Sequence, residues 1–242
     1  MGLKRIGIDI VNNLGFDIYK KPGKIYTNKL KLFKHLNIDC VLDVGANTGQ
    51  YASKLIKYGY KGTVLSFEPQ QKTFEILKNN AAQFPNWQVN NFGLGIKDET
   101  ALMNISANTE SSSILDINET HIEIAPNAVF VGKEQIILKQ LDSIFSEISK
   151  LHKNIFLKID TQGFEYNVLE GALKSLPYIK GIELEMSFVP LYKDEKTFAE
   201  MHDYITNKGF QLALIEPQIH QADTGALIQA DCVFVQKNNK TS

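Results

Sequence analysis

Short apolar runs that alternate with helical patterns constrain the fold of this chain more than any other feature. The runs at 40–46, 63–69 and 154–163 each close near a glycine or proline, and apolar side chains then recur every three or four positions. Runs that are apolar on both faces are typical of buried parallel strands. Their alternation with helices predicts an α/β fold with a mainly parallel sheet covered on both faces. Further strands are predicted at 87–95, 101–106, 179–188, 210–216 and 231–237.

The 242 residues are interpreted as one domain with an N-terminal extension. Residues 1–35 form the expected helical extension, in which four apolar residues spaced four apart predict an amphipathic helix that caps the domain: Ile6, Ile10, Leu14 and Ile18. The α/β domain is expected to cover 36–242. Within it, 107–140 is rich in Ser and Asn and then mixed in character, which predicts a loop or lid over an acceptor, with a strand near its end.

Charge and apolar patterning exclude several classes of partner. The 26 Lys and Arg residues are balanced by 27 Asp and Glu residues, so no global basic field would draw the chain to nucleic acid. No apolar stretch approaches the ~20 residues that cross a bilayer, so stable membrane insertion is not expected. Because the start of the chain also lacks the apolar core of a signal peptide, we expect a cytoplasmic protein.

The turn after the first run carries an unusual combination of acid and glycines. Gly45 and Gly49 permit a sharp turn and a close approach of the backbone to a ligand. The spacing is neither G-x-G-x-x-G nor that of a P-loop. Asp43 lies two positions before the first glycine, where a carboxylate would repel a pyrophosphate but would suit a cationic amino-acid group.

Glu68 ends the second run, 25 positions after Asp43. An acid at that place can accept both hydroxyls of an adenosine ribose. A solvated Glu at a strand end is the plainer alternative. Taken together, the two turns predict a ligand with a ribose and without a pyrophosphate, and S-adenosyl-L-methionine fits that description.

Two later strands also end in or carry acids. Asp160 directly follows an apolar run, where it would point into a central cleft or cap the next helix. Glu183 and Glu185 lie two apart in another apolar strand and therefore share one face. Two carboxylates on one face of an apolar strand need a hydrogen-bonding partner or an opposite charge, or they serve a function.

The segments DVGANTGQYA, SFEP, LKIDTQGFEYNVLEGA, IELEMSFVPLY and QADCVFVQK together resemble the FkbM-type family of S-adenosylmethionine-dependent methyltransferases. The resemblance runs from about residue 40 to residue 237. It implies a Rossmann-like class I methyltransferase fold, with a mainly parallel seven-stranded sheet and an antiparallel last strand. It also implies methyl transfer to a hydroxyl oxygen of a sugar, a glycan or a polyketide-like natural product.

The resemblance further implies which residues bind the cofactor. The implied residues around the methionine part are Asp43, Gly45, Ala46, Asn47, Gly49 and Tyr51. Glu68 and Pro69 correspond to the ribose contact, and Gly93 and Leu94 to the adenine contact. The acidic adenine contact common in class I enzymes is absent from this sequence. Asp160 corresponds to the acid beside the transferred methyl group.

Methyl transfer to an alcohol needs a group that orients the hydroxyl or takes its proton. We expect Asp160 in this role, with Glu185 and Glu165 as further candidates. Among the histidines, His121 is the one that a lid could bring over an acceptor. A metal site built from Asp160, Glu185 and His121 is conceivable, but no ligand spacing supports it, so no metal is predicted.

Three interpretations of the chain differ in what they predict. A methyltransferase would take a small-molecule or glycan acceptor and would act as a monomer or as a homodimer. An NAD-dependent oxidoreductase would also use a glycine turn and a ribose acid, but it predicts G-x-G-x-x-G. A non-catalytic module that only binds S-adenosylmethionine would not need acids at Asp160 and Glu185, so their presence favours an enzyme.

Overall fold

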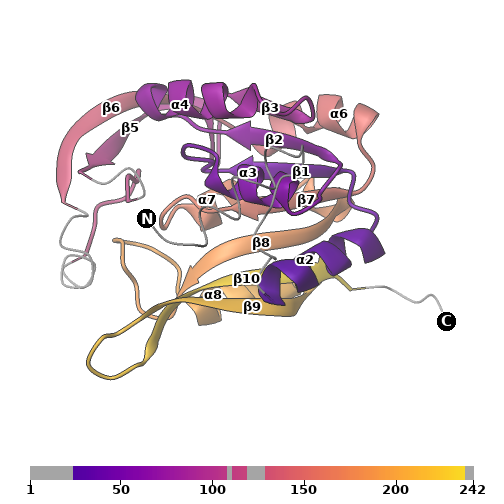
Figure 1. The fold of residues 1–242 in the computed structure, drawn as a ribbon. Coiled ribbons are helices and arrows are strands. Elements are labelled where there is room, and N and C mark those ends of the chain that lie inside the picture. Colours follow the sequence, from indigo (N-terminus) through magenta and orange to yellow (C-terminus); the bar gives the residue numbers. More distant parts are fainter. Residues whose placement is uncertain (1–23, 108–110, 119–128, 238–242) are drawn as a thin grey trace, which may run out of the picture.

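A twisted seven-stranded sheet forms the centre of the protein (Figure 1). The computed structural model describes residues 24–107, 111–118 and 129–237, so the amphipathic pattern at 6–18 lies outside the described residues. The strand order is β3-β2-β1-β7-β8-β10-β9, and β10 runs antiparallel to both of its neighbours while the other neighbours are parallel. This order confirms the predicted fold. The strands are β1 (Cys40–Val44), β2 (Thr63–Phe67), β3 (Trp87–Asn90), β7 (Ile155–Ile159), β8 (Ile179–Ser187), β9 (Phe210–His220) and β10 (Leu227–Gln236).

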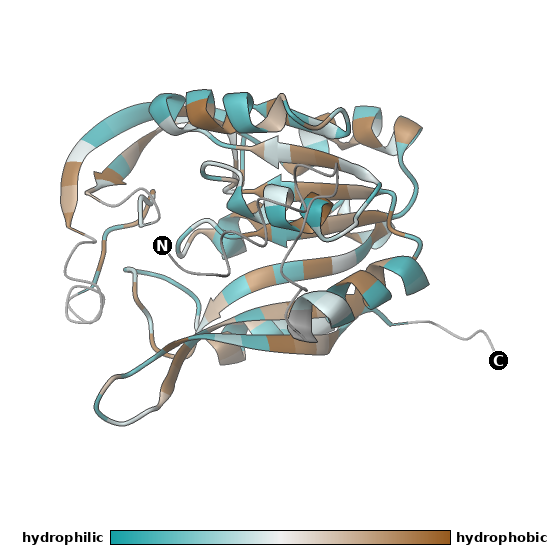
Figure 2. Cartoon of the chain, in the orientation of Figure 1, coloured by the Kyte–Doolittle hydropathy of each residue, from teal (hydrophilic) through white to brown (hydrophobic). Residues whose placement is uncertain are grey.

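Helices cover both faces of this sheet, as the apolar pattern of the strands requires. Every residue of β1 and of β7 is buried, because side chains on both faces of these central strands meet helices. Figure 2 shows the hydrophobic residues concentrated along these strands and on the inner sides of the helices. The helices are α2 (Lys24–His35), α3 (Gln50–Lys57) and α4 (Gln71–Ala81) on one face, and α6 (Leu141–Leu151), α7 (Glu165–Glu170) and α8 (Phe198–Asn207) on the other, with a short 3-10 helix at Leu176–Tyr178.

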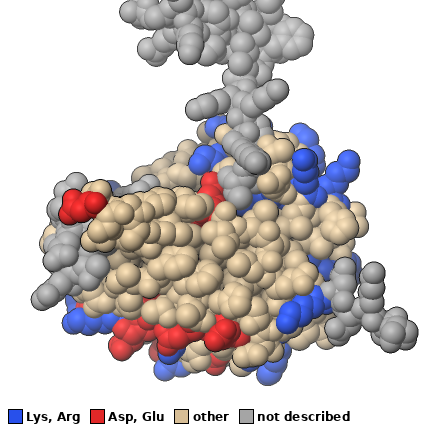
Figure 3. Space-filling model, turned by 90° about the horizontal axis from the view of Figure 1, so that it is seen from below, with Lys and Arg blue, Asp and Glu red and all other residues tan. Residues whose placement is uncertain are grey.

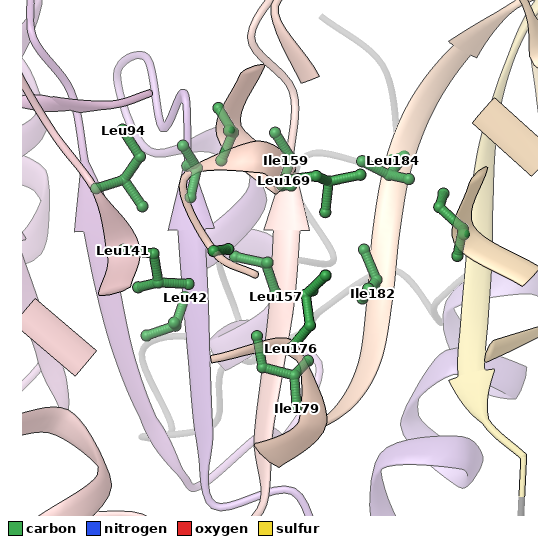
Figure 4. Close-up of a cluster of buried hydrophobic side chains, with 14 of the residues drawn as sticks. Leu42, Leu94, Leu141, Leu157, Ile159, Leu169, Leu176, Ile179, Ile182 and Leu184 are labelled. Atoms are coloured by element: carbon green, nitrogen blue, oxygen red, sulfur yellow. The ribbon is translucent and has the colours of Figure 1, made fainter. Parts of the chain in front are cut away.

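The two faces of the sheet have separate apolar cores. The larger core joins α6, α7 and α8 to the side chains of Leu42, Leu157 and Ile182, which lie next to one another on adjacent strands (Figure 4). The smaller core joins α2, α3 and α4 to the opposite face. In it, the ring centres of Phe33 of α2 and Phe156 of β7 lie 4.5 Å apart in a tilted arrangement, so α2 is packed into the domain.

A second, three-stranded sheet has the order β4-β6-β5. It consists of β4 (Gly93–Leu94), β5 (Glu99–Ser106) and β6 (Phe130–Lys139). The single strand predicted at 87–95 is therefore wrong: it divides at Asn91, whose side-chain amide donates to the carbonyl oxygens of Glu68 and Pro69. Within the segment 107–140, residues 130–139 form β6, and its Ile136 and Leu138 belong to the larger core. In Figure 1 the β5–β6 pair and the β9–β10 hairpin extend beyond the same edge of the main sheet.

The helix after β7 is shorter than the apolar stripe from Phe164 to Leu176 predicts. It ends at Glu170, and Gly171, which caps it, packs closely against Gly95. A Cβ at Gly171 would lie 1.9 Å from the carbonyl oxygen of Gly95. Among the described residues, no helix is long and apolar enough to cross a membrane.

Candidate active site

A cavity of about 410 Å3 lies where β1, β2, β7 and β8 end. Ligands of open α/β sheets bind outside the carboxyl ends of the strands, so the topology places the cavity where a site is expected. The sequence-selected residues that line it are Gly45, Ala46, Asn47, Tyr51, Glu68, Pro69, Gly93, Leu94, Asp160 and Glu185. His121 lies outside the described residues.

The turn after β1 forms one wall of the cavity. Gly45 has a φ of +71° and Asn47 a φ of +50°, so both adopt the left-handed conformation that the glycine pattern predicts for a sharp turn. The amides of Gly45 and Ala46 both donate to the carbonyl oxygen of Phe67, at 3.1 Å each, which fastens the turn to the end of β2. A Cβ at Gly45 would lie 1.8 Å from the carbonyl oxygen of Asp160. The glycine therefore allows the turns after β1 and β7 to touch.

Gly49 serves the packing of the fold and does not line the cavity. It has a φ of +91° and directly precedes α3. A Cβ there would lie 2.4 Å from the ring of Trp87, so the glycine lets the start of α3 rest on β3. Of the two glycines that the sequence predicts to approach a ligand, Gly45 lines the cavity, whereas Gly49 packs against Trp87.

Glu68 follows β2 and is held rigidly at the wall of the cavity. One carboxylate oxygen accepts a hydrogen bond from the amide of Gln70 and the other from the amide of Asn47, each at 2.9 Å. Burial raises the pKa of Glu68 to about 7, although these two hydrogen bonds favour the ionised form. Each oxygen keeps a further lone pair, so the carboxylate can accept two hydroxyl groups from a ligand.

Asp43 lies beneath the cavity and does not line it. Its carboxylate accepts a hydrogen bond from the hydroxyl of Ser66 at 2.9 Å and lies 3.1 Å from the ammonium of Lys158. Lys158 does line the cavity, and its ammonium is also 3.5 Å from the carboxylate of Asp160. Burial favours the neutral form of Lys158, but the carboxylates of Asp43 and Asp160 outweigh burial and raise its pKa above the ordinary value.

These groups belong to a polar row that crosses the middle of the sheet. Ser66, Asp43, Lys158 and Glu183 occupy matching register positions on β2, β1, β7 and β8, so all four point to the same face. The indole N–H of Trp87 on β3 donates to the hydroxyl of Ser66 at 2.9 Å and extends the row by one strand. Lys158 was not among the residues predicted for the site, although a lysine inside the apolar strand IFLKI is an unusual feature of the sequence.

Glu183, at the β8 end of the polar row, contacts a lysine of α2. Glu183 pairs with the buried ammonium of Lys29 at 2.5 Å and accepts a hydrogen bond from the hydroxyl of Tyr51 at 2.8 Å. The ammonium of Lys29 lies 4.8 Å from the ring centre of Tyr26 and 5.0 Å from that of Tyr51, within the range of cation–π attraction. Tyr26, Tyr51 and Glu183 all line the cavity, so α2 supplies part of its wall.

The acidic end of the cavity, defined here by Asp160, Glu183, Glu185 and Asp231, is contributed by β7, β8 and β10, whereas Glu68 follows β2 on the other side of β1. Gln162 is its central connector, with a φ of +57°. The side-chain amide of Gln162 donates to Asp160 at 2.9 Å and to Glu185 at 2.7 Å. Burial is the largest cause of the raised pKa of Glu185, and the charges of Asp160 and Asp231 add to it.

Asp231 belongs to the acidic end but was not among the residues predicted for the site. It lines the cavity, and one of its carboxylate oxygens accepts a hydrogen bond from the side-chain amide of Gln218 at 2.7 Å. Burial, reinforced by the charge of Glu183, raises its pKa. The available signal was an acid next to the apolar run CVFV, the same signal that marks Glu183 and Glu185.

Glu165 and Tyr192 support this end from behind without lining the cavity. The carboxylate of Glu165 accepts hydrogen bonds from the amide and the hydroxyl of Thr161, at 2.7 and 3.1 Å, and closes the turn before α7. Burial raises the pKa of Glu165 to about 8. Tyr192 is buried, and its hydroxyl donates to the side-chain oxygen of Gln162 at 2.8 Å.

Among the described residues, no group of three or more His, Cys, Asp or Glu side chains has the arrangement of a metal site. The acids at the acidic end are instead held by amides and lysines. Asp160 has 37% of its side chain exposed, against 4% for Glu183. The arrangement therefore combines an acceptor of two hydroxyls at Glu68 with a set of proton acceptors at the acidic end.

Comparisons with known proteins agree with this geometry. A family model described as the methyltransferase FkbM domain matches residues 43–212. A curated protein of Beauveria bassiana (strain ARSEF 2860) named Methyltransferase 1 is 23% identical over 189 residues, which cover 73% of this chain and 74% of that protein.

Solved structures of low sequence identity match over most of the chain. The magnesium protoporphyrin IX methyltransferase of Synechocystis PCC 6803 with bound SAM matches with 10% identity and a TM-score of 0.44, and 98% of each chain is covered. An rRNA methylase of Streptococcus thermophilus matches with 11% identity and a TM-score of 0.47, and 90% of this chain and 98% of that one are covered.

Proposed function

The chain belongs to the FkbM methyltransferase family, and on that basis we propose that it methylates a hydroxyl oxygen of a sugar, a glycan or a polyketide-like natural product. Its methyl donor is S-adenosyl-L-methionine, which supplies a methyl group bound to a positively charged sulfur. The family assignment favours methyl transfer over the nicotinamide-dependent alternative. The acceptor class needs further support from the residues of the cavity.

The residues of the cavity fit this donor. Glu68 would accept the two ribose hydroxyls, because each of its oxygens carries one backbone hydrogen bond and has a lone pair left. Gly45 to Asn47 would surround the methionine part, and Pro69, Gly93 and Leu94 the adenine. Asp43 would act indirectly, by holding Lys158 and thereby the turn that carries Asp160.

The observation that carries the acceptor class is the acidic end. A hydroxyl group needs a hydrogen-bond acceptor or a base before it can react, and Asp160 and Glu185 provide carboxylates at the acidic end of the cavity. Gln162 holds both carboxylates, so an acceptor hydroxyl would meet them in fixed positions. Ordinary carboxylates are weak bases, and the burial that raises the pKa of Glu185 makes it a stronger one.

The same acidic end disfavours a nucleic-acid acceptor, because carboxylates repel phosphate groups. On the face of the molecule shown in Figure 3, Lys side chains lie in separate groups near the edge, with a group of acidic side chains among them. Binding of a nucleic acid draws on lysines and arginines that follow the phosphate backbone. A neutral, hydroxyl-rich acceptor therefore suits this cavity better.

Calorimetric titration with S-adenosylhomocysteine tests the donor part of the proposal. The wild-type protein should bind, and Glu68→Ala should lose binding because both ribose contacts disappear. Glu75→Ala is the matched control, since Glu75 is an exposed acid on α4, and it should bind as the wild type does. No binding by folded wild-type protein would refute the assignment of the cavity.

Transfer of a radiolabelled methyl group tests the acceptor part. The panel should contain monosaccharides, oligosaccharides and hydroxylated polyketides, with total RNA as a separate arm. Label on a hydroxyl oxygen of one of the first three groups supports the proposal. Label on RNA, or on a nitrogen or carboxyl group of any acceptor, would overturn it.

A further inference from the structure

Glu185 and Asp231 lie directly opposite each other on two adjacent strands. In the antiparallel pairing of β8 with β10 the two residues are register partners, and both line the cavity. Register partners on antiparallel strands point to the same face, with Cβ atoms about 4.5–5.5 Å apart. Two carboxyl groups attached there are within reach of each other.

A glutamine amide holds each of these carboxyl groups in the same way. The amide of Gln162 donates to Oε2 of Glu185, and the amide of Gln218 donates to Oδ2 of Asp231, each at 2.7 Å. The orientation of Gln162 is fixed, because its side-chain oxygen accepts the hydroxyl of Tyr192. Oε1 of Glu185 and Oδ1 of Asp231 accept no hydrogen bond from the described residues. One oxygen of each carboxyl group is therefore left for a proton or a substrate.

No ammonium group in the described part of the chain pairs with either acid. Lys158 pairs with Asp43 and Asp160, and Lys29 pairs with Glu183. The charged groups that face the two acids are, from the elements packed around them, Asp160 and Lys158 of β7 and its end, Glu165 of α7, Glu183 of β8, Glu216 of β9 and Lys29 of α2. The titratable hydroxyls of Tyr26 and Tyr192 also face them. Most of the charged groups are acids, so the surroundings do not favour two adjacent negative charges.

We propose that Glu185 and Asp231 share one proton at neutral pH and act together on the acceptor. This role rests on the proposed methylation of a hydroxyl group. The ionised member accepts the proton of the acceptor hydroxyl as its oxygen bonds to the methyl carbon, while the electron pair of the methyl–sulfur bond stays on sulfur. The protonated member donates a hydrogen bond to a neighbouring oxygen of the acceptor. After transfer the pair carries two protons and releases one to solvent.

Proton sharing is a property of the ligand-free protein, so it can be tested without a known acceptor. The side-chain carboxyl carbons of Asp and Glu are labelled with 13C and followed by NMR from pH 4 to pH 9, and Glu185→Gln and Asp231→Asn assign the two signals. In the wild type both carbons should report the same two titration steps, separated by more than about one pH unit. Glu185→Gln should lower the pKa of Asp231, and Asp231→Asn should lower that of Glu185, each by about one unit or more.

Glu216→Gln is the matched control. Glu216 is also a register partner of Asp231, on β9, but it does not line the cavity. It should shift the titration of Asp231 less than Glu185→Gln does. An equal or larger shift would overturn the assignment of the pair, as would two independent single-step titrations in the wild type. Binding of S-adenosylhomocysteine by each variant shows that it is folded, and a failure to find O-methylation leaves the titration result intact.

Discussion

The buried ion pair between Asp43 and Lys158 should be among the most costly contacts to break from one side. The two charged atoms lie 3.1 Å apart, and the side chains are 0% and 8% exposed. Removing one partner of a buried pair costs about 3–5 kcal/mol, because the other charge stays buried without compensation. The two losses should differ here. Lys158 keeps Asp160 at 3.5 Å if Asp43 is neutralised, whereas Asp43 keeps only the hydroxyl of Ser66 if Lys158 is removed.

We therefore expect Lys158→Met to lower the free energy of unfolding by about 4–5 kcal/mol and Asp43→Asn by about 3 kcal/mol. The double variant should lose less than Lys158→Met alone, and less than the sum of the two single losses, because no uncompensated charge remains at this pair. Urea unfolding measures these values. Far-UV circular dichroism reports the whole fold, and fluorescence of Trp87, the single tryptophan of the chain, reports the polar row itself.

Lys150→Met is the control for the loss of a lysine as such. Lys150 pairs with Glu147 at 2.6 Å, but the two side chains are 65% and 74% exposed. Exposed pairs contribute about 0–1 kcal/mol, so this variant should stay close to the wild type. If Lys158→Met costs no more than this control, or if the two buried substitutions add without coupling, Asp43 is not a buried charge that depends on Lys158.

Three further predictions concern single residues. Affinity for S-adenosylhomocysteine should fall as the pH drops below 7, by roughly tenfold per unit, because Glu68 (pKa about 7) must be ionised to accept two hydroxyls; calorimetry at pH 5.5–8 measures this, and a flat profile would contradict it. Gly45→Ala should cost about 3 kcal/mol or more in urea unfolding, because its Cβ would lie 1.8 Å from the Asp160 carbonyl oxygen, whereas Gly132→Ala, with open space around its Cβ, should change stability by less than about 0.5 kcal/mol. The raised pKa of Glu165, about 8, means that the folded protein holds this proton longer than the unfolded chain, so its contribution to stability falls as pH rises from about 4.5 to 8. Glu165→Gln should remove that fall and raise the Tm relative to wild type at pH 8.5 but not at pH 5, and an equal difference at both pH values would refute it.

The central strands could be predicted because the apolar pattern of each strand directly reflects its burial on both faces of the sheet. The runs around Leu42 and Leu157 are apolar on both faces, and only the inner strands of a covered parallel sheet require that. The second sheet could not be predicted in the same way. β4 and β6 pair across more than forty residues, and the turn at Asn91 that separates β3 from β4 depends on carbonyl groups of another strand end.

The residues of the candidate site also differ in whether local sequence or strand pairing determines their role. Glu68 could be selected because an acid directly after a strand has a known place in this type of sheet. Asp231 and the role of Lys158 depend on which strands become neighbours, and β10 lies between β8 and β9 only in the folded sheet. A charged residue within an apolar run was visible in both cases, but its partner was not.

The polar row has a consequence for how the chain folds. Strands that are apolar on both faces carry little information about their alignment, since many shifted pairings would bury similar side chains. Ser66, Asp43 and Lys158 mark one position on each of three adjacent strands. A slip by one residue would turn Lys158 toward the larger apolar core, and a slip by two would move it about 6.6 Å from its partner. The charges beneath the cavity thereby make misaligned sheets unstable and select the single arrangement in which the strand ends meet.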